Sequence, residues 1–141
     1  MHSEHQQLFP QTSRTILVVD DDSDIRSLIR TFLVHEGYNV HICEDADRAV
    51  RIFRRSPGID LLITDFSMPE RTGMDLAVQI KSMRPTLPVL IVSGIIMAEA
   101  EFEQMRIRNW NFLPKPFSLP QLLAEVHRIL SSAAVQEALL P

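Results

Sequence analysis

The sequence predicts one doubly wound α/β domain, in which helices cover both faces of a five-stranded parallel sheet. Five short apolar runs alternate with segments whose apolar residues recur every three or four positions. Such alternation implies parallel strands joined by right-handed crossover helices. The runs are also continuously apolar, as in ILVV at residues 16–19 and LLI at residues 61–63, which is typical of strands buried on both sides.

The predicted strands are short runs rich in isoleucine, leucine and valine. Each has the length of an ordinary strand. They cover Ile16–Val19, Val40–Cys43, Ile59–Ile63, Val89–Val92 and, as the weakest run, Trp110–Leu113.

Amphipathic helices are predicted between and after these strands. The apolar positions are Ile25, Leu28, Ile29, Phe32 and Leu33 in the first helix, Ala46, Ala49, Val50 and Phe53 in the second, and Leu76, Ile80 and Met83 in the third. A fourth, less regular helix is expected over about Met97–Arg106. The fifth is expected over Ser118–Ser132, with Ser118 as its N-cap and Pro120 in its first turn. Its apolar side is formed by Leu122, Leu123, Val126, Ile129 and Leu130.

The pattern divides the chain into a flexible extension over residues 1–14, the domain over residues 15–132 and a tail over residues 133–141, for which two alternatives are open: it extends the fifth helix or it packs on a partner. A hydrophobic content of 45% and a charged content of 23% are those of a soluble domain with its own core. No run approaches the roughly 18 apolar residues of a membrane span, and residues 1–14 lack the features of a secretory signal. We therefore expect a cytoplasmic protein with no membrane partner.

Two further features of the composition exclude or disfavour particular classes of function. Cys43 is the only cysteine, which excludes an intramolecular disulfide and a cysteine-based zinc cluster. The net charge of −4 argues against direct binding of nucleic acid.

Polar side chains follow four of the predicted strands. Asp20 and Asp21 come after the first strand, Asp65 after the third, Ser93 after the fourth and Lys115 after the fifth. Ligands of open parallel sheets bind at the carboxyl ends of the strands, so we expect these groups to converge on one site.

The acids at the end of the first strand predict a cation site. Only one acid of Asp20-Asp21-Asp22 can cap the following helix, and close carboxylates repel each other by about 4 kcal/mol per pair at an effective dielectric of about 20. Oxygen ligands with no nearby histidine or cysteine favour a hard ion, Mg²⁺ first.

One carboxylate at this edge is also a candidate nucleophile. An aspartate with a pKa near its ordinary value of about 3.9 is already ionised and needs no general base. Its attack on phosphorus would give an acyl phosphate. The metal and Lys115 would then neutralise the added charge, while the hydroxyl of Ser93 donates to a phosphoryl oxygen.

The motifs ILVVDDD, ITDFSMP, IVSG and LPKPF occur in the order and at the spacing of one known family. Over about Thr15–Ser132 the chain resembles the receiver domain of two-component response regulators. The resemblance implies a flavodoxin-like (βα)5 fold with strand order 2-1-3-4-5 and Mg²⁺ as the cofactor.

The resemblance also implies a role for each motif residue. Asp20 and Asp21 correspond to the acidic pair that holds Mg²⁺, Asp65 to the phosphoacceptor and a further metal ligand, and Ser67 to a residue whose backbone carbonyl binds the metal. Ser93 corresponds to the hydroxyl that turns toward the phosphoryl group, Lys115 to the invariant lysine and Phe112 to the rotating aromatic residue. The Lys115–Pro116 peptide is expected to be cis.

The implied function is transfer of a phosphoryl group to Asp65 from a sensor histidine kinase or a histidine phosphotransfer protein, followed by slow self-dephosphorylation. The resemblance implies no other enzymatic activity. Ser93 and Phe112 would shift together and alter the face made by the fourth helix, the fifth strand and the fifth helix. That face would meet an unknown downstream protein or a second, phosphorylated copy. The sequence fits a stand-alone protein and a domain of a longer regulator or hybrid kinase equally well.

Two segments depart from the family pattern. The chain reads RIRNWN at residues 106–111, where the family usually has a small glycine-containing turn, so the fourth helix is expected to be short, shifted or irregular. One hypothesis is that Trp110, Arg106 and Arg108 form a partner-facing surface, and the alternative is that Trp110 packs against the domain edge. Ile95 cannot orient a hydrolytic water, so the phosphoryl group is expected to last longer than in an Ile95→Glu variant.

Two other functions would use part of the same set of residues. A phosphatase of the haloacid-dehalogenase type would use Asp20-x-Asp22, but it needs an acidic pair after the lysine, and only Glu125 and Glu137 follow Lys115. A receiver-fold interaction module that is never phosphorylated is the other alternative. The complete set of site residues counts against it.

Overall fold

The computed structural model describes residues 13–94 and 98–139 of the chain, with side chains described as far as Val135. The strands form a five-stranded parallel sheet in the order β2-β1-β3-β4-β5. This confirms the predicted fold class and strand order. Residues 1–12 of the predicted extension, and Ile95, lie outside the described residues.

The observed strands lie close to their predicted positions. They are β1 (Thr15–Val19), β2 (Asn39–Cys43), β3 (Ile59–Asp65), β4 (Val89–Ser93) and β5 (Asn111–Pro114). Strands β3 and β4 run further than predicted, so that Asp65 and Ser93 are their last residues.

Helices follow the strands along the described chain. They are α2 (Ser23–His35), α3 (Ala46–Arg55), α4 (Gly73–Met83), α5 (Glu99–Ile107) and α6 (Leu119–Leu139). The expected N-cap of α6 is present, because the Ser118 hydroxyl accepts a hydrogen bond from the backbone N–H of Gln121 at 3.1 Å. Among the described residues, no helix is both long enough and apolar enough to cross a membrane.

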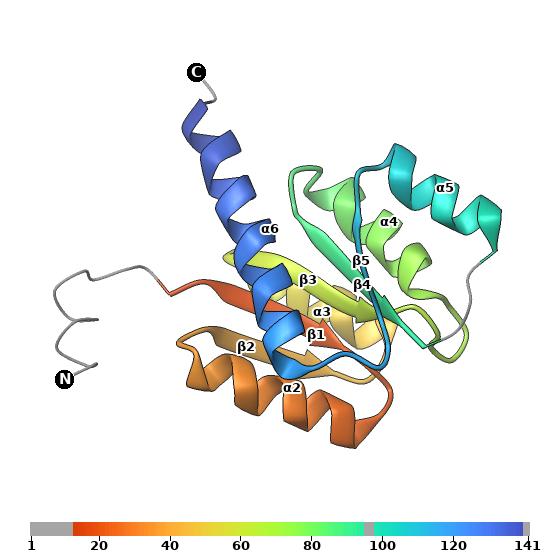
Figure 1. Cartoon of the computed structure of the whole chain (residues 1–141). Helices are drawn as coiled ribbons and strands as arrows, with labels where there is room; N and C mark the ends of the chain where they lie inside the picture. The colour runs from red at the N-terminus through yellow and green to blue at the C-terminus, as the bar shows by residue number, and fades with distance from the viewer. Residues whose placement is uncertain (1–12, 95–97, 140–141) are drawn as a thin grey trace, which may run out of the picture.

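Helix α6 continues beyond Ser132, where the amphipathic pattern placed its end, to Leu139 and runs past the sheet, so the tail extends the helix (Figure 1). The apolar stripe of α6 ends near Leu130, which explains why the sequence pattern placed the end of the helix close to that residue. Residues 133–139 read AAVQEAL and contain strong helix formers without glycine or proline, so helix propensity carries the helix beyond the core.

The sheet separates two layers of helices. Helices α2 and α6 lie on one face, and α3, α4 and α5 on the other (Figure 1). In β1, Leu17 and Val19 belong to the core under α3–α5, whereas Ile16 and Val18 belong to the core under α2 and α6. The alternation of side chains along a strand therefore buries every one of these residues. Leu28 differs from its predicted role in the apolar face of α2, since it is 55% exposed.

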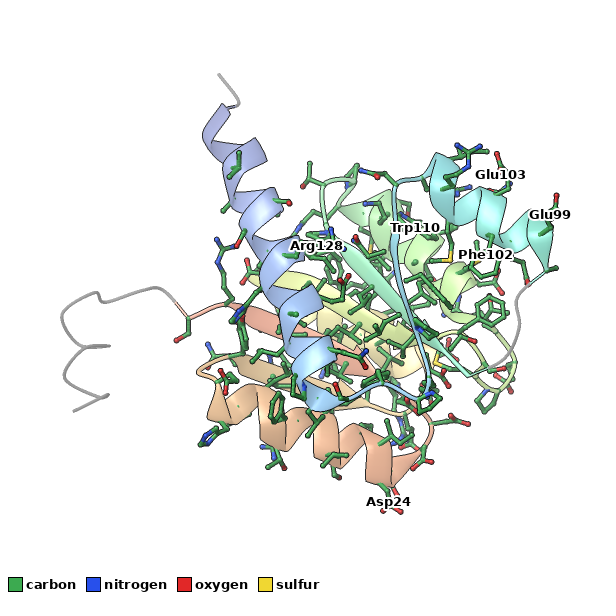
Figure 2. All side chains as sticks on the ribbon, in the orientation of Figure 1. Asp24, Glu99, Phe102, Glu103, Trp110 and Arg128 are labelled. Carbon is green, nitrogen blue, oxygen red and sulfur yellow. The ribbon has the colours of Figure 1, made fainter. Side chains whose placement is uncertain are left out.

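Trp110 is buried, so the hypothesis that it forms a partner-facing surface is wrong. It is 8% exposed, belongs to the same core as Met105, and lies near β5 (Figure 2). The cause is the end of α5. Asn109 has a φ of 59°, its N–H bonds to the carbonyl of Arg106 at 3.1 Å, and the N–H of Trp110 bonds to the carbonyl of Met105 at 3.0 Å. This is the Schellman arrangement, in which asparagine replaces the usual glycine and the next residue packs back on the helix.

Candidate functional site

The predicted site residues converge at the carboxyl edge of the sheet. Asp20 follows β1, Asp65 and Ser93 end the adjacent strands β3 and β4, and Lys115 follows β5. Three of them are almost inaccessible, with exposures of 1% for Asp20, 7% for Asp65 and 2% for Ser93. Such polar groups are costly to bury unless they are paired, so this edge is built around polar contacts.

Three carboxylates gather here. Asp20, Asp21 and Asp65 each place a carboxylate oxygen within 4.8 Å of the other two, with Asp21 exposed and the others buried. Asp22 takes a different role as the N-cap of α2, because its Oδ1 accepts hydrogen bonds from the N–H groups of Asp24 at 2.9 Å and Ile25 at 3.2 Å. The consecutive acids therefore divide between capping and the cluster.

Lys115 is the cation of this cluster. Its Nζ lies 3.1 Å from Oδ2 of Asp20 and 3.4 Å from Oδ1 of Asp65. Its backbone N–H donates to the carbonyl of Ser93 at 2.7 Å, and the Lys115–Pro116 peptide is cis, as the resemblance implies. The other oxygen of Asp20, Oδ1, accepts from the N–H of Asp22 at 2.9 Å. The side chain of Asp20 is thus held from two sides.

The charges in the cluster do not balance. Burial raises the pKa of Asp65, the Lys115 ammonium opposes that rise, and the Asp20 and Asp21 carboxylates add to it. Burial also lowers the pKa of Lys115, but the attraction of Asp20 and Asp65 outweighs burial and raises it overall. One ammonium faces three carboxylates, so the cluster has room for further positive charge.

The donor set fits Mg²⁺. Ligand oxygens around an octahedral ion at about 2.0–2.1 Å are roughly 3 to 4 Å apart, which agrees with the 4.8 Å limit of this cluster. All three donors are carboxylates, and the exposure of Asp21 leaves one side open to the water molecules that Mg²⁺ usually retains. Asp20, Asp21 and Asp65 are therefore described residues that could hold the ion.

The chain matches a known family over most of its length. Residues 16–127 match the family profile described as "Response regulator receiver domain". This chain belongs to the receiver domain family. It is 37% identical over 120 residues to the DNA-binding transcriptional regulator NtrC of Rhizobium meliloti, which covers 85% of this chain and 25% of that protein. It is 30% identical over 123 residues to the response regulator MprA of Mycobacterium leprae, covering 87% of this chain and 54% of that protein.

Solved receiver structures have the same fold. The receiver domain of the hybrid histidine kinase CckA is 32% identical with a TM-score of 0.70, covering 82% of this chain and 98% of that one. NtrX of Brucella abortus is 30% identical with a TM-score of 0.81, covering 90% of this chain and 29% of that one. A receiver domain protein of Methanospirillum hungatei is 22% identical with a TM-score of 0.81, covering 89% and 99%. The chain spans about a quarter of the NtrC length and about half of the MprA length.

The segment between β3 and α4 lies close against the backbone of Asp65. A Cβ added to Gly73 would lie 2.2 Å from the carbonyl oxygen of Asp65, and the N–H of Gly73 bonds to the carbonyl of Phe66 at 2.7 Å. Only glycine allows α4 to begin this close to the backbone of Asp65. Sequence reasoning missed Gly73, since a glycine at a helix start gives no sign of what approaches it. Ser67 lies in this loop, bridged to Thr72, and its carbonyl as a metal ligand stays a prediction.

Phe112 lies on β5 of the receiver domain and is partly buried against the core. Its ring meets Phe102 of α5 edge-on, with ring centroids 5.4 Å apart. Phe102 extends from α5 toward β5 and is 44% exposed, so this contact lies close to the surface. Sequence reasoning identified Phe112 and missed Phe102, because the α5 pattern was too irregular to place its faces.

Proposed function

We propose that this receiver domain accepts a phosphoryl group on Asp65 from a phosphohistidine of a sensor histidine kinase or a histidine phosphotransfer protein. Receiver domains of response regulators are substrates of sensor histidine kinases. The observation that carries the assignment to Asp65 is its position, buried at the end of β3 with Lys115 3.4 Å away and two further carboxylates beside it. Asp20 and Asp21 flank it as the acidic pair.

In the proposed reaction a carboxylate oxygen of Asp65 attacks phosphorus. The new O–P bond forms as the N–P bond to the donor imidazole breaks, and the imidazole leaves with the electron pair of that bond. Lys115 holds an oxygen of the Asp65 carboxylate and places positive charge where the phosphoryl oxygens arrive. The hydroxyl of Ser93, at the end of the adjacent strand, donates to a phosphoryl oxygen.

Asp20, Asp21 and Asp65, with the backbone carbonyl of Ser67, are the proposed Mg²⁺ ligands. The bound ion supplies positive charge against the carboxylates and the incoming phosphoryl group. Asp20 suits this role because its side chain is fixed by the N–H of Asp22 and by Lys115. Loss of the phosphoryl group by self-catalysed hydrolysis completes the cycle, and we propose no other enzymatic activity.

The proposed output is a change in the face formed by α5, β5 and α6. Ser93 turns toward the phosphoryl group, and Phe112 moves with it because β5 pairs with β4 in parallel register. Phe112 contacts Phe102 on α5, so its movement reaches the surface of this face. The downstream partner is proposed to be a protein in the cytoplasm, or a second phosphorylated copy, that distinguishes the two arrangements.

Incubation with acetyl phosphate and Mg²⁺, followed by intact-mass measurement, tests the proposal. The wild-type chain is expected to gain one phosphoryl group, as is Asp24→Asn, which changes an exposed acid of α2 outside the cluster. Asp65→Asn is expected to gain none. Labelling of Asp65→Asn would contradict the site assignment. Absence of labelling in the wild type would favour a receiver fold that acts without phosphorylation.

A further inference from the structure

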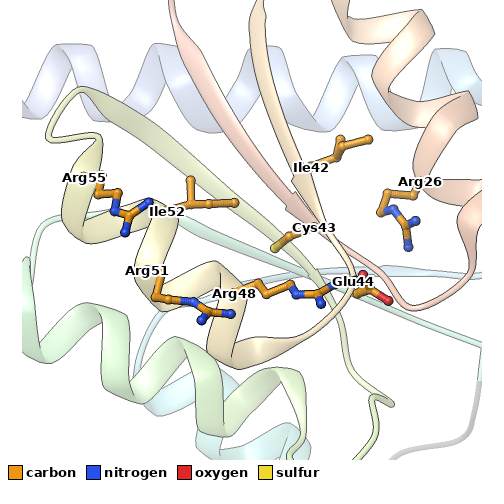
Figure 3. A pocket seen from close by; sticks show the side chains of 8 residues that line it. All are labelled: Arg26, Ile42, Cys43, Glu44, Arg48, Arg51, Ile52 and Arg55. Carbon is orange, nitrogen blue, oxygen red and sulfur yellow. Dashed lines mark hydrogen bonds and ion pairs between the residues drawn. The ribbon is translucent and has the colours of Figure 1, made fainter.

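A second polar feature lies at the β2 edge of the sheet, apart from Asp65 and Lys115. It is a groove with a volume of about 520 Å³ between α2 and α3 (Figure 3). Four of the side chains that line it are arginines, and Ile42 and Ile52 contribute apolar surface between them. The arginines are Arg26, Arg48, Arg51 and Arg55. Glu44 is the one acid in the lining, so the groove is basic although the chain carries a net charge of −4.

Helix geometry places three of these arginines in a row. Arg48, Arg51 and Arg55 are spaced by three and four residues along α3, which puts them on one face of the helix. Arg26 stands across the end of β2 on α2 (Figure 3). The groove therefore presents guanidinium groups from both layers of helices around one edge of the sheet.

Two of the four arginines make no ion pair or hydrogen bond with the residues that the structure describes. Arg48 pairs with Glu44, and Arg26 donates to the carbonyl of Asp20 at 2.8 Å. Within the part of the chain that the structure describes, Arg51 and Arg55 have no ion pair or hydrogen bond. Like charges four residues apart destabilise a helix. An anionic partner in the groove would therefore reduce the repulsion between the guanidinium groups of Arg51 and Arg55.

The strand at the base of the groove is open on one side. In the described chain β2 pairs with β1 alone. The N–H of Asn39 bonds to the carbonyl of Arg14 at 2.9 Å, and the carbonyl of Cys43 accepts from the N–H of Asp20 at 3.2 Å. Because main-chain groups alternate in direction along a strand, those of Val40 and Ile42 point to the open edge. An edge of this kind pairs with an added strand.

We propose that this groove binds an acidic, extended peptide segment of a partner protein, which adds as a strand to the open edge of β2. Its main chain pairs with Val40 and Ile42. Side chains alternate along the added strand, so its carboxylates face Arg51 and Arg55 on the α3 side. The intervening apolar residues face the α2 side, where Ile42 packs against the core under α2 and α6. A peptide matches both the main-chain edge and the charge, whereas a nucleic acid matches the charge only.

The test is fluorescence anisotropy with a labelled peptide of alternating glutamate and valine, added to the full, unphosphorylated chain at low salt. We expect saturable binding that Arg51→Glu combined with Arg55→Glu weakens about tenfold. Arg54→Glu is the matched control, because Arg54 is exposed on the same last turn of α3 but does not line the groove. It is expected to change the affinity by less than about twofold. Acetyl-phosphate labelling of Asp65 in each variant verifies that the domain is folded.

Further arms identify what the groove recognises. A lysine–valine peptide of the same length, and the glutamate–valine peptide with N-methylated amides, are both expected to bind at least about tenfold more weakly. Equal binding of the N-methylated peptide would overturn pairing with β2. An equal effect of Arg54→Glu would overturn the groove as the site. Binding of a DNA duplex but not of the peptide would overturn the proposal. Binding of neither would also overturn it, and the arginines would then serve to keep β2 from pairing with the edge strand of another molecule.

Discussion

The ammonium of Lys115 lies 3.1 Å from Oδ2 of Asp20, which joins the residue after β5 to the residue after β1 across two intervening strands. Asp65 lies between them at 3.4 Å from the same nitrogen. This arrangement brings three carboxylates together with one cation in a largely buried place. The receiver site is thus assembled at a cost in electrostatic energy, so changes to its charges should affect the stability of the fold as well as phosphorylation.

Asp65→Asn is expected to stabilise the chain in the absence of Mg²⁺ at neutral pH. Burial raises the pKa of Asp65, so folding disfavours its ionised form. The neutral amide avoids this cost, and we expect the free energy of unfolding to rise on the order of 1 kcal/mol. The gain should be full above the raised pKa and shrink as the pH falls from there through the ordinary value of about 3.8, below which the carboxyl is protonated in both the folded and the unfolded chain. Urea unfolding at several pH values measures this, and a lower midpoint than the wild type at pH 7 would contradict it.

Mg²⁺ is expected to stabilise the wild-type chain against heat. An ion that binds only the folded state at about 100 times its dissociation constant adds about 2.7 kcal/mol. Asp21→Asn removes the exposed carboxylate of the proposed Mg²⁺ site and should abolish most of the increase in melting temperature, whereas Asp24→Asn should retain it. Scanning calorimetry with Mg²⁺ and with EDTA provides the comparison. An equal increase in both variants would place the ion elsewhere.

Gly73→Ala is expected to destabilise the fold by about 1–3 kcal/mol and to slow phosphorylation of Asp65. The new Cβ would lie 2.2 Å from the Asp65 carbonyl oxygen, so α4 or the end of β3 must shift. Gly58→Ala is the control, since nothing lies within 4 Å of its added Cβ. Unfolding midpoints and acetyl-phosphate labelling rates report the two effects separately. Equal behaviour of the two variants would show that the contact is relieved without consequence.

The sequence predicted the parts of the fold that follow from local pattern. Continuous apolar runs identified β1 and β3 because both faces of these strands are buried, and the polar residues at their ends indicated the site. The features that it missed depend on what packs against a residue. Trp110 is buried because Asn109 takes a left-handed conformation, and glycine is needed at position 73 because the carbonyl of Asp65 lies next to it. Neither relationship can be recognised from the spacing of apolar residues in the sequence.

The same reasoning applies to surfaces. The row of arginines on α3 is visible in the sequence, but its meaning depends on β2 being the edge strand beside it. The length of α6 was underestimated because the apolar stripe, which reports packing, ends before the helix does. Local patterns therefore predict which face of an element is buried, and three-dimensional structure is needed to show what an exposed face lies next to.

Cys43 is expected to resist thiol reagents in the folded chain. Burial raises the pKa of this thiol to about 11, so it stays protonated at neutral pH. The unfolded chain then loses the proton first, and the stability contributed by Cys43 should fall as the pH rises from its ordinary pKa through about 11, by about 2 kcal/mol. Urea unfolding of the wild type and of Cys43→Ala at several pH values measures this contribution to the free energy of unfolding. A constant difference between the two from pH 8 to pH 11, or rapid labelling of the folded wild type by iodoacetamide, would contradict it.

Phe112→Ala is expected to separate phosphorylation from its effect on α5. Phe112 meets Phe102 edge-on at 5.4 Å and is partly buried, so in the proposed function it carries movement from the end of β4 to an exposed ring. Alanine removes that contact, while Asp65 and Lys115 stay intact. We expect acetyl-phosphate labelling to stay within about twofold of the wild type, while the phosphorylation-dependent chemical shift changes of the α5 amides become several times smaller.

Phe117→Ala serves as the control for loss of an aromatic ring, because Phe117 packs against the opposite core, under α2 and α6. It should leave the α5 response intact. If Phe112→Ala responds to phosphorylation like the wild type, the movement reaches α5 by a route that does not use this aromatic contact. If both variants lose the response together with labelling, the aromatic residues support the fold of the site, and the coupling between Phe112 and Phe102 does not carry the switch.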